Sequence, residues 1–165
     1  MTYEYEDPYR YTLSREIPAL GNEGTVLFVM LNPSTADERQ DDPTIRRCID
    51  FAARWGFARL EVVNLYALRS TDPRGLFAVD DPVGPNNDSQ IERAVRNSPE
   101  VIVAWGANPH PGGAERVRTV LDLIDHYAGG ARCLGQTARL HPRHPLYVKR
   151  DSPRPYFKQE ARVYV

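Results

Sequence analysis

The chain has 165 residues, of which 41% are hydrophobic, and this is the usual size of one domain with a core of its own. Its 21 Lys and Arg nearly balance its 22 Asp and Glu. The balance excludes a strongly basic or acidic protein, whose net charge alone would select nucleic acid or a membrane surface as a partner. We expect a single domain over residues 1–165.

Charge is unevenly distributed along the chain. Residues 1–45 carry nine acidic and three basic side chains, whereas residues 131–165 carry two acidic and eight basic ones. A cationic segment beside a binding site favours an anionic ligand, whereas one far from any site is only solvated, and both interpretations stay open. The eight basic residues are Arg132, Arg139, Arg143, Lys149, Arg150, Arg154, Lys158 and Arg162.

The two cysteines, Cys48 and Cys133, are too few for a cysteine-ligated zinc site or an iron–sulfur cluster within one chain. We expect both in the core. No apolar run approaches the ~20 residues of a membrane span, and the acidic, tyrosine-rich start lacks the features of a signal peptide. These patterns predict a cytoplasmic protein without a membrane partner, a metal or a cofactor.

Strand and helix patterns alternate from the start of the chain. The sequence YRYTL at residues 9–13 alternates in polarity, so we predict an N-terminal edge strand or hairpin that pairs antiparallel with the next strand. That next strand is TVLFVML at residues 25–31, apolar on both faces as a strand between two helix layers would be. Asp42 and Pro43 then begin a helix that ends at Gly56.

The same alternation continues to residue 134. Residues 60–66 and 100–105 have the pattern of strands, residues 86–97 that of a capped helix, and residues 113–127 that of a helix stopped by two glycines. The sequence ARCL then forms a fourth strand. The alternation predicts an α/β fold with three αβα layers around a central four-stranded, mainly parallel sheet.

Polar residues follow each predicted strand. Ligands of open parallel sheets bind beyond the carboxyl ends of the strands, so we predict that these residues form one polar site. They are Asn32, Pro33, Ser34 and Thr35 after the first strand, Asn64 and Arg69 after the second, Trp105, Gly106 and Asn108 after the third, and Gln136, His141, Arg143 and His144 after the fourth.

Most of these candidates also have a structural explanation. Asn32 precedes Pro33, where an asparagine often bonds only to local backbone in a turn. Trp105 ends a buried strand and is more often a core residue than a stacking platform. His141 either braces a proline-rich loop or takes part in the site. Asn64 favours a ligand most strongly, because an amide beside the core needs hydrogen-bond partners.

Four segments resemble the motifs of the uracil-DNA glycosylase superfamily, in which an early strand ends in GQDP or GINP and a later loop carries HPSPL. They are LNPSTAD, VVNLYA, VAWGAN and HPRHPLY, and their order and spacing agree over residues 25–148. Together with DDPTIRRC, RWG and DPVG, the same segments resemble a bacterial and phage family known as domain of unknown function number 1643.

The glycosylase resemblance implies a role for each matched residue. Asn32 matches the position that holds the hydrolytic water, and Asn64 matches the asparagine that binds the edge of an extruded base. His141 matches the histidine that donates to a base carbonyl as negative charge develops there. Leu146 or Tyr147 falls near the wedge that enters the vacated base stack.

The implied function is metal-independent hydrolysis of an N-glycosidic bond in a modified base, nucleoside or nucleotide, either free or in DNA. The nucleobase-containing ligand would contact further residues after the strands and in the last loop, namely Pro33, Ser34, Trp105, Gly106, Arg143 and His144. Additional candidates are Asp37, Asp42, Arg47 and Arg69.

The chain departs from the glycosylase motifs in three places. The first motif, MLNPS, lacks the glycine before the polar residue, and Arg143 stands where a small serine lets the backbone approach phosphate. The insert after Asn32 contains Asp37, Asp41 and Asp42. These acids either stabilise a helix start, as is common, or supply a catalytic carboxylate.

Two other functions stay open. One is a non-catalytic nucleotide or nucleic-acid binding module on the same fold, with Arg139, Arg143, Lys149 and Arg150 meeting phosphates. The other is a metal hydrolase with His110, His141 and His144 as ligands, which is the weakest reading because these histidines lack the helical i, i+4 spacing of metal-binding pairs.

Overall fold

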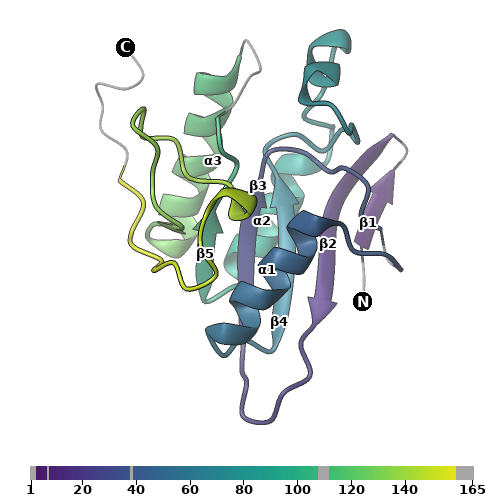
Figure 1. The fold of residues 1–165 in the computed structure, drawn as a ribbon. Helices are drawn as coiled ribbons and strands as arrows, with labels where there is room; N and C mark the ends of the chain where they lie inside the picture. Colours follow the sequence, from purple (N-terminus) through teal and green to yellow (C-terminus); the bar gives the residue numbers. More distant parts are fainter. Residues whose placement is uncertain (1–2, 7, 38, 108–111, 159–165) are drawn as a thin grey trace.

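The computed structural model describes residues 3–6, 8–37, 39–107 and 112–158. Asn108, His110 and Arg162, which the sequence singled out, lie outside these residues. The described chain forms one six-stranded sheet with the strand order β1-β2-β4-β3-β5-β6. Helices pack against both faces of this sheet (Figure 1), so the predicted α/β class is confirmed.

Four strands of the sheet are parallel. They are β3 (Thr25–Met30), β4 (Arg59–Asn64), β5 (Glu100–Val103) and the two-residue β6 (Arg132–Cys133). Apart from the first residue of each, their residues are buried, as expected for apolar strands between helix layers. Met30 pairs with Asn64, so β3 and β4 end side by side and deliver their following residues to one place.

The remaining strands make the sheet mixed rather than mainly parallel, which corrects the sequence prediction. The strands β1 (Tyr3–Glu6) and β2 (Tyr9–Glu16) form an antiparallel hairpin, and β2 pairs antiparallel with β4 through Leu13 and Val62. The predicted pairing of residues 9–13 with β3 is therefore wrong. Alternating polarity shows which face of a strand is buried, but it does not specify the neighbouring strand.

The strand β2 contains a β-bulge. Glu4 pairs with Thr12 and Tyr5 pairs with Arg10, so Tyr11 is an extra residue of β2 between these two pairs. An extra residue reverses the alternation of side chains beyond it. Arg10 therefore lies on the same face of the sheet as Leu13. Its Nη1 donates to the carbonyl oxygen of Ala36, and Ala36 and Leu13 belong to the same core cluster.

Each face of the sheet is covered by helices. The helix α1 (Pro43–Arg54) packs Ile45, Cys48 and Phe51 on one face, and the helices α2 (Asn87–Arg96) and α3 (Gly113–Ala128) cover the other (Figure 1). The glycine stop after α3 is confirmed, because Gly129 has φ 73°, a conformation that side-chain-bearing residues rarely adopt. Cys48 and Cys133 are both free and buried, as predicted.

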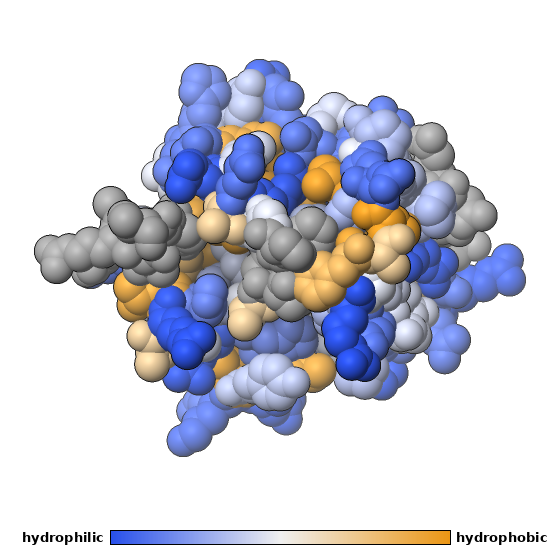
Figure 2. All heavy atoms as spheres, turned by 90° about the horizontal axis from the view of Figure 1, so that it is seen from above, coloured by the Kyte–Doolittle hydropathy of each residue, from blue (hydrophilic) through white to orange (hydrophobic). Residues whose placement is uncertain are grey.

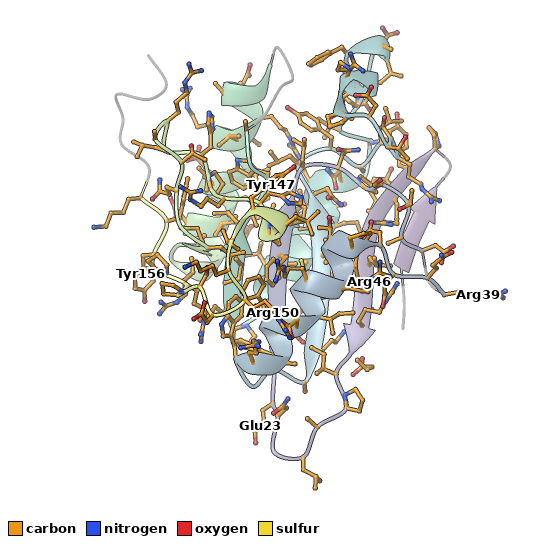
Figure 3. The ribbon with its side chains drawn as sticks, in the orientation of Figure 1. Glu23, Arg39, Arg46, Tyr147, Arg150 and Tyr156 are labelled. Carbon is orange, nitrogen blue, oxygen red and sulfur yellow. The ribbon has the colours of Figure 1, made fainter. Side chains whose placement is uncertain are left out.

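Two short 3₁₀ helices, η1 (Pro73–Ala78) and η2 (Pro145–Tyr147), complete the described fold. In Figure 1 the helix η1 stands at the top of the view, whereas Tyr147 of η2 lies nearer the middle, in front of the sheet (Figure 3). The loop that contains Glu23 lies at the bottom (Figure 3). No helix within the described ranges is long and apolar enough to cross a membrane.

Candidate functional site

A cavity of about 440 Å³ lies beyond the carboxyl ends of β3, β4 and β5. Its walls come from the residues after these strands, the start of α1, the start of η1 and the turn η2. Seen from above, this end of the molecule shows hydrophobic side chains among hydrophilic ones (Figure 2). The cavity volume is within the range of about 300–1,000 Å³ that is typical of small-molecule sites.

The cavity brings together most of the residues predicted from the sequence. Of the fifteen residues named for the glycosylase-like site and as additional candidates, nine line it: Asn32, Ser34, Asp42, Asn64, Trp105, Gly106, His144, Leu146 and Tyr147. The other six are not among the lining residues in the described part of the chain: Pro33, Asp37, Arg47, Arg69, His141 and Arg143. Segments after three strands therefore converge on one cavity, as the sequence predicted. Of the proline-rich loop, residues 141–147, only His144, Leu146 and Tyr147 line it.

Asn64 lines the cavity, and hydrogen bonds hold the backbone that carries its side-chain amide. The residue is 3% exposed, and its side chain makes no hydrogen bond with any described residue. Its backbone is held by Asn87, whose Nδ2 donates to the carbonyl oxygens of Asn64 and Leu65 at 3.0 and 3.2 Å. Arg116 Nε also donates to Leu65 O, at 2.7 Å. The Asn64 amide thus has both a donor and an acceptor to offer to a ligand.

The sequence did not identify the supporting role of Asn87. Residues 86–97 were predicted as a capped helix, yet Asn86 makes no side-chain cap at the start of α2. Asn87 is instead fully buried and bonds across to the end of β4. A pair of asparagines before a helix is typical of capping, and it carries no signal for a contact 23 residues away.

Asn32 is fixed in orientation at the edge of the cavity. Its Nδ2 donates to Pro33 O at 3.0 Å and to Ser70 O at 2.8 Å. These two bonds leave Oδ1 as an acceptor that has no hydrogen bond from a described residue. The local-backbone explanation and the water-holding role are therefore compatible, because they use different atoms of one amide.

His144 contributes a neutral imidazole. Its Nδ1 accepts a hydrogen bond from Leu146 N at 3.2 Å, which places the ring proton on Nε2. Burial lowers the pKa of His144 below its ordinary value of 6.5, against the opposing effect of Asp42, so the neutral form dominates near pH 7. The ring therefore has one N–H left to donate in the cavity.

His141 lies in a turn beside the site. Its backbone N–H donates to Thr137 Oγ1 at 3.2 Å, and its carbonyl accepts from Thr137 N at 2.8 Å. The buried Pro142 follows, and Arg143 N donates to Gly135 O at 2.9 Å. This arrangement turns the chain so that His144, rather than His141, lines the cavity.

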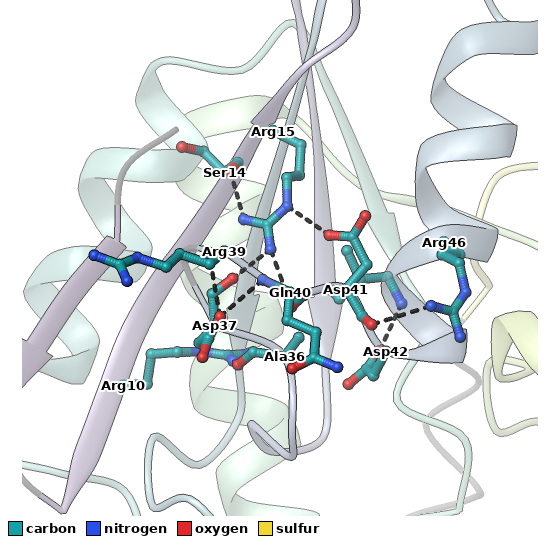
Figure 4. A network of polar contacts seen from close by, with 11 residues as sticks. Arg10, Ser14, Arg15, Ala36, Asp37, Arg39, Gln40, Asp41, Asp42 and Arg46 are labelled. Carbon is teal, nitrogen blue, oxygen red and sulfur yellow. Dashed lines mark hydrogen bonds and ion pairs between the residues drawn. The ribbon is translucent and has the colours of Figure 1, made fainter.

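The acidic insert is held in place mainly by Arg15 (Figure 4). The Arg15 guanidinium is buried, pairs with Asp41 at 2.7 Å and donates to the carbonyls of Ser14, Asp37 and Gln40. Asp37 Oδ1 accepts two backbone N–H bonds within the insert, and these lower the pKa of its carboxyl. Asp37 and Asp41 thus have structural partners outside the cavity.

Asp42 is the only carboxylate among the described residues that line the cavity. It is also the N-cap of α1, where its Oδ1 accepts from Ile45 N at 2.8 Å. The helix-start interpretation is therefore confirmed for Asp42. Its second carboxylate oxygen is not used by this cap.

Arg10 is a cavity residue that the sequence did not identify. Its side chain is 3% exposed, its Nη1 donates to Ala36 O, and it forms no ion pair with a described residue. Its Nε is buried without a hydrogen-bond partner. Burial, with the nearby charge of Arg69 next in effect, lowers the pKa of Arg10 to about 10. The guanidinium stays charged at neutral pH, and the nearby carboxylates of Asp42 and Asp37 offset only part of the lowering, without an ion pair to Arg10 among the described residues.

Residues 10–146 match the model of a family described as "Protein of unknown function (DUF1643)". The chain belongs to this family. No curated protein and no solved structure is significantly similar to the chain. The match extends from Arg10 to Leu146, so it covers every described cavity residue of this DUF1643 protein except Tyr147.

The basic C-terminal segment of the DUF1643 protein is largely engaged in structural contacts. Glu100 pairs with Arg132 at 3.1 Å and with Arg154 at 2.6 Å, and Asp50 pairs with Arg150 at 2.9 Å. Arg139, Arg143 and Lys149 make no ion pair in the described part of the chain, and none of them lines the cavity. Within the same residues, no group of three His, Cys, Asp or Glu is arranged to hold a metal ion.

The lowered pKa of His144 predicts a loss of stability in mild acid. Below pH 6.5 the unfolded chain takes up a proton at His144 while the folded site resists it, so the free energy of unfolding falls until the pH reaches the lower folded pKa. Melting curves between about pH 8 and pH 5 should show this loss in the wild type. In His144→Asn the loss should be smaller, because an asparagine oxygen can still accept from Leu146 N without titrating. Parallel curves for the two proteins would contradict the prediction.

Proposed function

We propose that the cavity binds a nucleobase-containing ligand and hydrolyses its N-glycosidic bond, on a three-layer fold of the uracil-DNA glycosylase type. The observation that carries the proposal is the unpartnered Asn64 amide, held on a rigid strand end in a cavity that also contains Asn32 and His144. The resemblance of LNPSTAD, VVNLYA and VAWGAN to the glycosylase motifs supports the same conclusion.

Base recognition requires a group that donates and accepts at one edge, and Asn64 has both. Trp105 lines the same cavity, is 2% exposed, and packs its ring edge-on to Phe157 with the centroids 6.2 Å apart. The indole is thus a core residue that also offers an apolar surface to the cavity. A planar base would be held by this surface and oriented by the amide.

Hydrolysis breaks the bond between C1′ and the base nitrogen and forms a bond between C1′ and a water oxygen. Asn32 Oδ1 accepts from this water and orients it, and the Asp42 carboxylate takes the proton that the water loses. The bonding electrons leave with the base, where the His144 Nε2–H donates to the developing negative charge. His144 thus takes the role that the glycosylase resemblance assigned to His141.

The proposal is tested by a screen for base release from DNA, RNA, nucleosides and nucleotides, with modified bases included. With an active substrate, Asn64→Ala should lower kcat/KM about 10- to 100-fold, because a base edge would lose two hydrogen bonds in a dry site. The control Asn97→Ala changes an exposed asparagine at the end of α2 and should have no effect. Release that is insensitive to Asn64, or no release from any substrate, would overturn the hydrolase assignment.

The binding-module alternative predicts a different outcome of the same screen. It is favoured if a ligand binds with Asn64-dependent affinity and no base is released. Asn32 would then only stabilise its turn, through the bonds from its Nδ2 to Pro33 O and Ser70 O. Asp42 would only cap the start of α1.

A further inference from the structure

Arg10 is an unusual residue for the wall of a cavity. Buried arginines normally pair with carboxylates or satisfy most of their five N–H groups. Arg15, on the same strand, does this with one carboxylate and three carbonyls. Arg10 donates to a single carbonyl through Nη1, and neither Nε nor Nη2 has a partner among the described residues. The guanidinium edge formed by Nε and Nη2 therefore lacks an acceptor.

The geometry points to a mononucleotide as the ligand, with Arg10 binding its terminal phosphate. This inference rests on the proposed function for the base-binding half of the site and on Arg10 for the phosphate half. The guanidinium edge matches two oxygens of a phosphate or carboxylate, and in a dry site such a contact is about twice as strong as a neutral hydrogen bond.

The surroundings of Arg10 favour an anion as well. The start of the 12-residue helix α1 lines the same cavity through Thr44 and Ile45, so the positive end of the helix lies at the cavity. Pro43 has no N–H, and Ile45 N and Arg46 N bond to Asp42, so Thr44 N is the one donor of this first turn that is left for a ligand. Ser34 and Thr71 add hydroxyls. The one carboxylate present, Asp42, has its Oδ1 engaged by Ile45 N.

The burial of Arg10 favours a terminal phosphate over one inside a polymer. A phosphodiester continues into a chain on both sides and needs an open, cationic track along the surface. Arg10 is 3% exposed, while Arg139, Arg143 and Lys149, which form no ion pair with a described residue, are not among the residues that line the cavity. A dianionic phosphate monoester ends the molecule and fits such an enclosed position.

The bulge in β2 explains how the site acquires this cation. Without the extra residue Tyr11, regular alternation would place Arg10 on the opposite face from Leu13. With it, Arg10 faces the α1 side of the sheet and lines the cavity together with Val62 and Asn64. Bulges that re-aim a side chain are frequent next to functional sites.

Calorimetric titrations of the full chain with a panel of nucleosides, their 5′-monophosphates, inorganic phosphate and a single-stranded oligonucleotide test the inference. At least one monophosphate should bind about 10- to 100-fold more tightly than its nucleoside, since a charged hydrogen-bonded contact is added. Arg10→Gln should abolish this difference, and Arg10→Lys, which keeps the charge without the planar two-donor edge, should reduce it. Arg46→Gln, which removes an exposed cation near the start of α1, is the matched control and should preserve the difference.

Equal affinities for nucleosides and monophosphates in the wild type would overturn the inference. So would a preference for the oligonucleotide, or binding of none of the probes. Circular dichroism of each variant establishes that it is folded, and Arg10→Lys keeps a cation if Arg10→Gln is unstable. Monophosphate binding that depends on Arg10 without base release would leave this inference standing and remove the proposed hydrolysis, so the two failures are distinct.

Discussion

Replacing His144 by asparagine is expected to lower kcat for base release about 100- to 1,000-fold, the loss seen when one donor to a developing anion is removed. KM should change little, because the Nε2–H bond strengthens mainly in the transition state. The variant retains an acceptor for Leu146 N, so the turn η2 should stay folded. Steady-state kinetics on the substrate found in the base-release screen gives both constants.

The matched control is His141→Asn, which changes the neighbouring histidine of the same loop. We expect it to have a small effect, because His141 is not among the described cavity residues. His144→Gln should recover part of the lost rate, since its amide can again donate at the longer reach. A larger loss in His141→Asn than in His144→Asn would contradict the assignment and favour the role implied by the glycosylase resemblance.

The sequence predicted those parts of the fold that depend on local pattern. Apolar runs located β3, β4 and β5, helical spacing located the three helices, and the glycines after residue 128 marked the end of α3. Polar residues after the strands predicted a shared site, and nine of the fifteen candidates line one cavity. The order of strands in the sheet was not predictable in the same way, because β2 could pair with either β3 or β4 on the basis of its polarity.

The parts of the site that escaped prediction depend on conformation rather than composition. The sequence YRYTL alternates regularly, and no residue in it signals that Tyr11 forms a bulge that turns Arg10 toward the cavity. In the proline-rich loop, His141 and His144 have similar flanks, and hydrogen bonds to Thr137 and Gly135 determine which one enters the site.

Arg10 and Arg15 allow a test of whether a buried arginine serves the fold or the ligand. Both lie on β2, both are buried, and both bond to carbonyls of the segment that follows β3. Arg15 also pairs with Asp41 at 2.7 Å, with side-chain exposures of 6% and 33%. We expect Arg15→Met to lower the free energy of unfolding by about 2–4 kcal/mol, because Asp41 and several carbonyls lose their donor.

Arg10→Met should behave in the opposite way. Burial lowers the pKa of Arg10 from 12.5 to about 10, which means that holding the charge in the folded state costs about 3 kcal/mol at neutral pH. The sign follows from linkage: the unfolded chain binds this proton more tightly, so the cost applies below pH 10 and is removed with the guanidinium. Only the bond to Ala36 O is lost in exchange.

Chemical denaturation at pH 7 should therefore show Arg10→Met to be as stable as the wild type, or more stable by about 1–3 kcal/mol. The same variant should lose its preference for nucleoside monophosphates. Unchanged or higher stability together with weaker ligand binding is expected when a residue is kept for binding at the expense of stability. If Arg10→Met is destabilised as much as Arg15→Met, Arg10 is a structural residue of the fold, and its unpartnered edge has no functional meaning.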